Sequence, residues 1–362
     1  MSTKLYLLIV LLILTTSGIV QAQSVEEPQA ADQARLAAES LVLDVTRAGQ
    51  RFVAVGERGH VLLSSDGTSW EQAEFVPVRA TLTRVTFAGG RLWAVGHDST
   101  IIHSRDMGRT WTLQHFEPEW EKPLLDVHFF NANDGIAIGA YGLYMQTANA
   151  GEDWEVFDMA DLVTSEAIDW EGAAEEADDF SQGADDELYG DEDDSDEYYD
   201  ASTDFDRGCY EFMECHLNAF ADLGGDRYMI AAERGYGFRT TDGGESWESF
   251  KFPYTGSMFD LLQLGDGSIL AFGLRGNIQL SSDFGDSWTV LESGTESTLK
   301  AGTMDPEGQP FMVGSGATQL RYDPVRQRFD LDEDRLGSTY AAVLFTDEGR
   351  KILAGEDGLT ND

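Results

Sequence analysis

An eight-residue segment that ends in tryptophan decides the fold: Thr240-Thr-Asp-Gly-Gly-Glu-Ser-Trp247. The same pattern recurs at 104–111 and 281–288, with asparagine in place of aspartate at 147–154, and one residue shorter at 64–70. An Asp or Asn side chain can accept hydrogen bonds from the backbone of its own turn, glycine allows a positive φ, and tryptophan packs between sheets. We therefore predict one recurring structural turn, an Asp-box, built on Asp66, Trp70, Asp106, Gly108, Trp111, Asn149, Trp154, Asp242, Gly244, Trp247, Asp283, Gly285 and Trp288.

A segment of small and apolar residues recurs seven times along the chain. Successive copies are 40 to 43 residues apart at five of the six intervals and 93 apart at the third, which indicates an insertion. Each repeat reads as four short strands, and seven such repeats predict an all-β fold, a seven-bladed β-propeller. The sixth repeat lacks the Asp-box, and the seventh ends before it. The last blade therefore has either three strands or a fourth from the residues before Leu41. The seven copies are Phe52–Gly56, Leu92–Gly96, Ile136–Gly139, Tyr228–Ala232, Ile269–Gly273, Phe311–Gly314 and Ile352–Gly355.

The first residues have the pattern of a secretory signal. Lys4 precedes an apolar run at 5–14, and Val20-Gln-Ala22 offers a small-residue cleavage site. We predict a signal peptide at 1–22, a flexible lead-in at 23–40 and the propeller at 41–362. The protein is then expected in the periplasm, or in the thylakoid lumen of a photosynthetic organism, without a membrane anchor after cleavage. An uncleaved anchor is the alternative.

The chain carries 24 Lys and Arg against 66 Asp and Glu, a net charge of −42. Such a surface repels nucleic acid and anionic lipid. Residues 155–206 hold 22 of the acids and no Lys or Arg. We predict that 155–215 is a disordered acidic insertion between blades 3 and 4. It is either a solvated tail or a site for basic segments or weak Ca²⁺ binding. The loop pattern of a rigid calcium site is absent, so no metal or cofactor is predicted.

Only two cysteines occur, Cys209 and Cys215. In an exported protein the two are expected to form a disulfide, which would close a small loop where the insertion returns to blade 4.

Two sets of residues are candidate sites. The turn after the second strand carries arginine in three repeats, at Arg58, Arg234 and Arg275, and arginine suits carboxylates and phosphates. We predict a partner-binding role for them, chiefly for Arg234 and Arg275 on adjacent blades. The alternative is that they are ordinary exposed residues or pair with nearby glutamates. The second set lies on the first strands, which face the central tunnel, and would either hold a ligand or line a wet channel: Asp44, Arg84, Asp126, Asn218, Asp260, Lys300 and Tyr340.

Asp-boxes also occur in sialidases, so that chemistry must be considered. A retaining sialidase needs an arginine triad, a tyrosine nucleophile with a supporting glutamate, and an acid. The Phe-Arg-Ile-Pro type motif of such enzymes and a Ser nucleophile elbow are both missing, and the six histidines are scattered. No catalytic residue is predicted, and a sialidase-like glycosidase or glycan-binding propeller remains the alternative.

The small-residue strand followed closely by an Asp-box resembles the photosystem II stability/assembly factor family and its bacterial relatives. The resemblance extends from Leu41 to Gly358 apart from the insertion, and His216-Leu-Asn-Ala219 fits the bacterial members. It implies an exported, non-enzymatic, monomeric scaffold that helps membrane-protein complexes assemble. It also implies an arginine patch as binding surface, which Arg58, Arg234 and Arg275 match in kind. Two features depart from the family: the lipid-anchoring cysteine common in cyanobacterial members is missing, and the acidic insertion is foreign to photosynthetic members.

Overall fold

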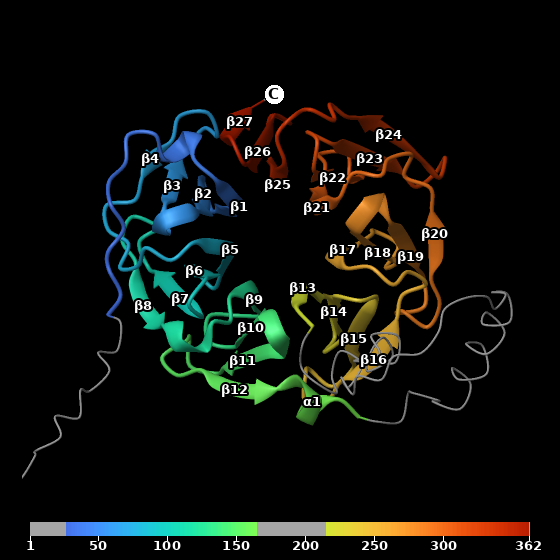
Figure 1. Ribbon diagram of the computed structural model, residues 1–362, viewed down its shortest axis with the longest axis horizontal. Helices are drawn as coiled ribbons and strands as arrows, with labels where there is room; N and C mark the ends of the chain where they lie inside the picture. The colour runs from blue at the N-terminus through green and yellow to red at the C-terminus, as the bar shows by residue number, and fades with distance from the viewer. Residues whose placement is uncertain (1–26, 165–214, 362) are drawn as a thin grey trace, which may run out of the picture.

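Seven small antiparallel sheets surround a central tunnel in the computed structural model, which describes residues 27–164 and 215–361 (Figure 1). The sheets follow one another around the ring in chain order, and β25 of the last sheet contacts β1 of the first. The predicted all-β, seven-bladed β-propeller is confirmed.

Within each blade the strands run in chain order from the tunnel to the rim. Blades 1 to 4 consist of β1 (Val42–Ala48), β2 (Arg51–Gly56), β3 (Val61–Ser64), β4 (Glu71–Gln72); β5 (Leu82–Ala88), β6 (Arg91–Gly96), β7 (Thr100–Ser104), β8 (Thr112–His115); β9 (Leu124–Phe129), β10 (Gly135–Gly139), β11 (Leu143–Thr147), β12 (Glu155–Asp158); and β13 (Leu217–Asp222), β14 (Tyr228–Ala232), β15 (Tyr236–Thr240), β16 (Glu248–Lys251). Blades 5 to 7 consist of β17 (Met258–Gln263), β18 (Ile269–Gly273), β19 (Ile278–Ser281), β20 (Thr289–Leu291); β21 (Leu299–Met304), β22 (Pro310–Gly314), β23 (Gln319–Asp323), β24 (Arg328–Asp332); and β25 (Tyr340–Phe345), β26 (Lys351–Gly355), β27 (Gly358–Asn361).

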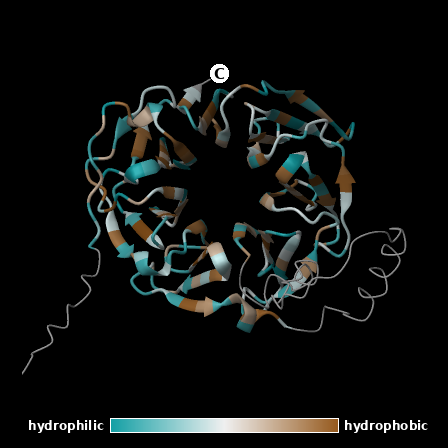
Figure 2. Cartoon of the chain, viewed as in Figure 1, coloured by the Kyte–Doolittle hydropathy of each residue, from teal (hydrophilic) through white to brown (hydrophobic). Residues whose placement is uncertain are grey.

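The core lies between the faces of neighbouring blades. Every residue of the second strands β10, β14, β18 and β22 is buried, because these strands are covered on both faces. One hydrophobic cluster, for example, joins Val53 and Leu63 of blade 1 to Leu92 and Trp111 of blade 2. Figure 2 shows hydrophobic residues in the strands of every blade. This explains why the second strand is the one whose small, apolar sequence repeats.

The predicted boundary of the acidic insertion is wrong at its start. Residues 155–158 form β12, the fourth strand of blade 3, and pair with β11. A short helix, α1 (Met159–Leu162), follows, and Val163 bridges to Trp247 of blade 4. The strand forms there because Trp154 opens it, as in the other repeats. The rest of the predicted insertion, with Cys209, and the predicted signal peptide at 1–22 lie outside the described residues. Cys215 is buried, and no free cysteine occurs in the described ranges.

The lead-in packs against the propeller from residue 31 onward, although the sequence predicted a flexible segment. Ala31 N donates to Val76 O at 3.0 Å, and Gln33 Nε2 donates to Ala73 O at 2.8 Å, so this segment follows blade 1. A single 3₁₀ turn, η1 (Ala37–Glu39), then contacts β27. The lead-in does not add a strand, and blade 7 has three strands within the described part of the chain.

The Asp-box turn of blade 4 shows how the repeated motif works. Asp242 Oδ1 accepts a hydrogen bond from Ser246 N at 3.0 Å, and Oδ2 accepts one from Ser246 Oγ at 2.6 Å. Thr240 Oγ1 accepts the N–H of Gly244, whose φ is +91°. Partial burial raises the pKa of Asp242, but the hydrogen bonds from Ser246 and Thr240 outweigh it and hold the pKa at about 2. Trp247 is 1% exposed and stands edge-on to Tyr144 of blade 3, at 6.0 Å, so the turn locks two blades together.

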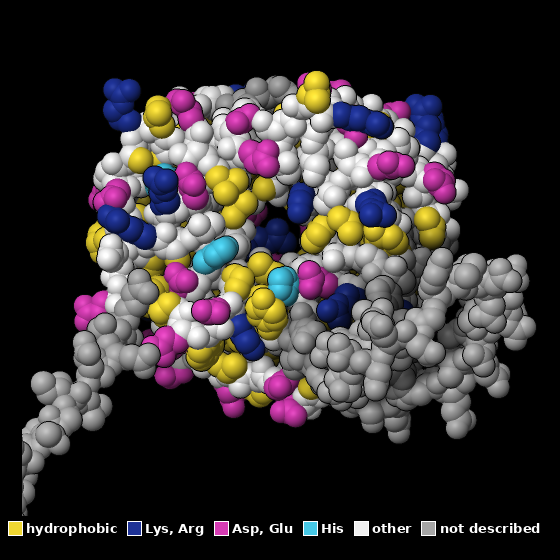
Figure 3. All heavy atoms as spheres, in the orientation of Figure 1, with side chains coloured by type: hydrophobic (Ala, Val, Ile, Leu, Met, Phe, Trp, Pro, Cys, Tyr) yellow, Lys and Arg dark blue, Asp and Glu magenta, His cyan; other side chains and the backbone are white. Residues whose placement is uncertain are grey.

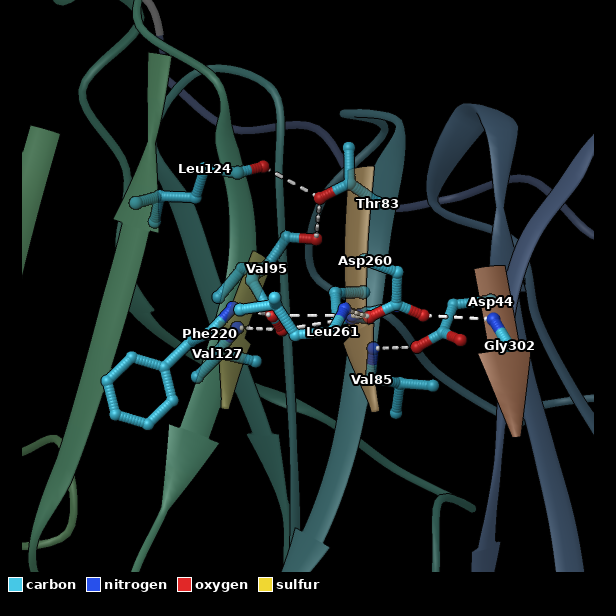
Figure 4. A network of polar contacts seen from close by, with 12 residues as sticks. Asp44, Thr83, Val85, Val95, Leu124, Val127, Phe220, Asp260, Leu261 and Gly302 are labelled. Carbon is cyan, nitrogen blue, oxygen red and sulfur yellow. Dashed lines mark hydrogen bonds and ion pairs between the residues drawn. The ribbon is translucent and has the colours of Figure 1, made fainter. Parts of the chain in front are cut away.

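A β-bulge in the first strand of every blade places side chains in the tunnel. In blades 1, 3 and 5 the residue after the bulge is aspartate, and each carboxylate bonds a backbone N–H of the following blade. Figure 4 shows this network. The pairs are Asp44 Oδ2 with Val85 N at 2.8 Å, Asp126 Oδ2 with Phe220 N at 2.8 Å, and Asp260 Oδ2 with Gly302 N at 2.9 Å.

Arg84 of blade 2 pairs with two of the three carboxylates. Its Nε donates to Asp126 Oδ1 at 2.9 Å, and its Nη2 lies 3.8 Å from Asp260 Oδ1 across the ring. Burial lowers the pKa of Arg84, but the negative charges of Asp126, Asp44 and Asp260 outweigh this effect and hold the pKa well above the usual range. One cation does not compensate three buried acids. Burial raises the pKa of Asp44 to about 6, with Arg84 opposing the shift, and burial also raises the pKa of Asp260.

We expect Asp242→Ala to destabilise the fold by about 1–2 kcal/mol, because the variant leaves the N–H groups of the Asp-box turn without their acceptor. Urea unfolding followed by tryptophan fluorescence measures the free energy of unfolding. Asp332→Ala, an exposed acid of β24, is the matched control and should change stability by less than about 0.5 kcal/mol. Equal stability of the two variants would contradict a structural role for the turn.

We expect the tunnel to make stability depend on pH near neutrality. The pKa of Asp44 rises from 3.8 to about 6 on folding, so the folded state binds this proton more tightly than the unfolded state. Stability should therefore increase as pH falls through 6. Asp44→Asn keeps an acceptor for Val85 N but cannot take up the proton. Between about pH 7.5 and pH 5 the wild type should gain about 1 kcal/mol more than this variant. Urea unfolding at both pH values measures the difference, with Asp332→Asn as control. The same pH response in wild type and Asp44→Asn would refute the coupling.

Candidate functional site

The turn after the second strand has the same unusual backbone in blades 1 to 5. Its middle residue adopts a left-handed conformation, which is uncommon for residues other than glycine. The residues and their φ angles are Arg58 (54°), Asp98 (58°), Tyr141 (53°), Arg234 (56°) and Arg275 (56°). In blades 1, 3 and 5 the turn is a short 3₁₀ segment: η2 (Glu57–Gly59), η4 (Ala140–Gly142) and η7 (Leu274–Gly276).

In blades 1, 3, 4 and 5 a glycine follows the middle residue, and it fixes this turn against the entry to the next blade. A Cβ atom on Gly59 would lie 2.0 Å from Val78 O, and one on Gly235 would lie 2.2 Å from Tyr254 O. No side chain fits at such a distance, so only glycine allows the close approach. The backbone is therefore held in place while the preceding side chain projects outward. Arg58, Arg234 and Arg275 are all exposed.

Arg58 and Arg275 do not form the ion pairs with nearby glutamates that the sequence left open as an alternative. Within the described ranges, no ion pair involves Arg58 or Arg275. Glu233 instead accepts the backbone N–H of His216 at 3.1 Å and lies 3.6 Å from its Nδ1. In a chain with far more acids than bases, the two guanidinium groups remain available to an acidic ligand.

Arg234 and Arg275 lie on adjacent blades, 4 and 5, while Arg58 lies on blade 1, with blades 2 and 3 between it and Arg234. Sequence reasoning missed Tyr141, which occupies the equivalent position on blade 3 and is 46% exposed. An alignment of all the repeats would have shown that Tyr141 stands at the position of the arginines. Tyr141, Arg234 and Arg275 thus follow one another on three successive blades. Figure 3 shows one face of the ring, hollowed at its centre, with Lys and Arg side chains spread around the opening.

The second predicted set, the tunnel ring, divides into two groups. The structure brings together Asp44, Arg84, Asp126 and Asp260, whose polar atoms are engaged in links between blades. The other three residues lie before the bulge-shifted position: Asn218 donates to Met258 O at 2.9 Å, Lys300 Nζ lies 4.4 Å from the centre of the Phe259 ring, and Tyr340 pairs with Gly355. No group of three or more His, Cys, Asp or Glu side chains in the described part could hold a metal ion.

In residues 27–164 and 215–361, none of the helices has the length and apolar character needed to span a bilayer.

Comparison with known proteins gives relatives of one kind. No protein-family model matches the chain. The photosystem II assembly lipoprotein Ycf48 of Prochlorococcus marinus is 26% identical over 209 residues, which cover 53% of this chain and 56% of that protein. Its counterpart from Synechococcus sp. (strain CC9902) is 31% identical over 100 residues, 27% of this chain and 30% of that protein. The chain thus spans about half the length, or less, of the curated relatives it matches.

Solved structures share the fold over almost the whole length. A structure of YCF48 bound to D1 peptide has a TM-score of 0.62 at 16% identity and covers 94% of this chain and 96% of its own. YCF48 from Cyanidioschyzon merolae has a TM-score of 0.61 at 16% identity, with coverage of 91% and 97%. The WD40 propeller of Doa1 is as similar in fold, with a TM-score of 0.62 at 12% identity and coverage of 92% and 95%. At these identities the structural comparison shows only that the fold is shared. The sequence matches are what point to the photosystem II assembly factors rather than to other propellers. The chain is a seven-bladed β-propeller similar to the photosystem II assembly factors.

Proposed function

We propose that this protein is a non-enzymatic scaffold that binds an acidic segment of a protein partner through Arg234 and Arg275. The observation that carries the proposal is the placement of two exposed arginines at the same rigid turn of adjacent blades. The similar YCF48 structure is bound to a peptide, and the curated relatives are named as assembly proteins. By this proposal the partner is a subunit of a membrane-protein complex during its assembly.

The chemistry of the turn suits such a role. A guanidinium group offers parallel N–H donors to a carboxylate, and a charge-assisted pair of this kind is stronger than a neutral hydrogen bond. Because the backbone is already fixed by Gly235 and Gly276, little ordering remains to be done when a partner binds. The surrounding charge of −42 repels acidic surfaces in general. Binding is therefore restricted to an acidic segment that reaches Arg234 and Arg275 directly.

The repeated acids do not form a catalytic arrangement by this proposal. Asp242 and Asp283 are bonded within their turns, and hydrogen bonds from Ser287 lower the pKa of Asp283 to about 2. Asp44, Asp126 and Asp260 link blades. The proposal places the protein as a monomer in the periplasm, or in the thylakoid lumen of a photosynthetic organism, where exposed segments of membrane-protein complexes are accessible.

We expect Arg234→Glu/Arg275→Glu to abolish capture of the partner complex from detergent-solubilised membranes. Two lost charge-assisted contacts should weaken binding by on the order of a hundredfold, as measured by titration with the captured subunit. The matched control is Arg326→Glu/Arg328→Glu on blade 6, which changes the net charge equally on exposed arginines. Equal capture by both double variants would refute the site. Capture of nothing by the wild type, together with turnover of a sialoside, would instead support the glycosidase alternative.

A further inference from the structure

A groove between blades 2 and 3 is the candidate for a second site, apart from the arginine-bearing turns. It encloses about 550 Å³ and is lined by residues that include His103, Arg105, Thr112, Gln114 and Glu152. We call it the blade 2–3 groove. It lies beside the Asp-box turns, at the opposite ends of the third strands from the turns that carry Arg234 and Arg275.

The equivalent groove between blades 4 and 5 is filled by the protein itself. Arg239, which precedes the Asp-box as His103 does, donates to both oxygens of Glu248 at 3.0 Å and to Asp286 at 2.6 Å. In the repeat register, Thr112 replaces Glu248 and Glu152 replaces Asp286. The blade 2–3 groove is hollow because the shorter His103 and Thr112 stand where an ion pair fills its counterpart.

The walls of the blade 2–3 groove have unmet hydrogen-bonding capacity. His103 is 7% exposed, and its Nδ1 has no hydrogen-bond partner in the described part of the chain. Gln114 Nε2 donates to Ala150 O at 2.8 Å, but Oε1 of the same side chain has no donor there. Buried polar groups without partners are uncommon and costly, so two along one groove point to a missing ligand.

One arginine, Arg105, lines this groove together with the acids Asp106 and Glu152, and a second, Arg91, acts on the charge of His103 from nearby. Leu92 pairs with Ser104, which makes Arg91 and Arg105 the next opposed residues on neighbouring strands. Neither side chain forms an ion pair or hydrogen bond with any described residue, although like charges so placed repel. Burial lowers the pKa of His103, and Arg105 and Arg91 lower it further, outweighing the effect of Glu152. A single anion between Arg91 and Arg105 would relieve the repulsion between their charges.

We propose that the blade 2–3 groove binds a single carboxylate carried on a small hydroxylated molecule of the size of a hexuronic acid. The carboxylate pairs with Arg105 and Arg91, because a guanidinium group matches its two oxygens. The hydroxyl groups bond Thr112, Glu152 and the unpartnered His103. The volume exceeds what a bare ion needs, and Glu152 and Asp106 at the groove disfavour molecules with several negative charges.

Calorimetric titration of the full chain with glucuronate, at constant ionic strength, tests this assignment. Glucose and acetate serve as probes that lack the carboxylate and the hydroxyl groups, respectively. We expect binding of glucuronate, at least about tenfold weaker binding of glucose and of acetate, and a shift of the His103 imidazole resonances on addition of glucuronate. Arg105→Gln should weaken glucuronate binding by about tenfold or more, whereas Arg328→Gln on blade 6 should leave it unchanged.

Failure to detect heat or a His103 shift with glucuronate would overturn the proposal, as would equal affinity for glucose or for acetate. Unchanged affinity in Arg105→Gln would also overturn it. Because the His103 shift is measured in the wild type, the proposal remains testable if the variant folds poorly. Arg234→Glu/Arg275→Glu should bind glucuronate normally, which separates this site from the partner-binding face.

Discussion

The ring depends on hydrogen bonds that cross from one blade to the next near the tunnel. Blades 1, 3 and 5 each send an aspartate carboxylate to the backbone of the following blade. The interfaces between blades 2 and 3 and between blades 4 and 5 use other groups. Thr83 Oγ1 donates to Leu124 O at 2.7 Å, and Asn218 Nδ2 donates to Met258 O. A buried backbone N–H needs a partner, so each carboxylate satisfies one donor while fixing the angle between two sheets. Arg84 offsets part of the cost of burying these acids by pairing with Asp126 and Asp260.

This inner network determines where the outer surfaces lie. With each first strand fixed by its neighbour, the turn at the end of the second strand falls at the same height in every blade. Glycine contacts with the next entry segment remove the remaining freedom. The middle residues can then vary without disturbing the ring, and the sequence shows such variation: arginine in blades 1, 4 and 5, aspartate in blade 2 and tyrosine in blade 3. Because the inner network holds the ring together, the outer residues can also differ between blade interfaces. The blade 2–3 groove can therefore be open while the equivalent groove at Arg239 is closed.

Much of the architecture could be predicted from the sequence, because one turn motif and one small-residue strand recur at a regular spacing. The bulge in each first strand could not, since it has no residue signature of its own. The tunnel positions of Asn218 and Lys300 were therefore misaligned with those of Asp126 and Asp260. The start of the insertion was missed because the acidic composition of 155–158 concealed a strand. Arg234 and Arg275 were found by comparing equivalent turns. The pairing of Arg84 with acids from two other blades depends on the closed ring and has no local sequence signal.

Six of the seven blade interfaces join blades that are consecutive in the chain, and the seventh does not. Blade 7 meets blade 1 through contacts such as Arg47 with Asp347, which are 300 residues apart in sequence, and Arg350 with the carbonyl of Asp66. The entropic cost of bringing such distant segments together is met only after the intervening blades have formed. The molecule therefore behaves as a linear array of blades with a single seam. We therefore expect that seam to be the latest contact to form in folding and the place where the ring opens first under mechanical or thermal stress.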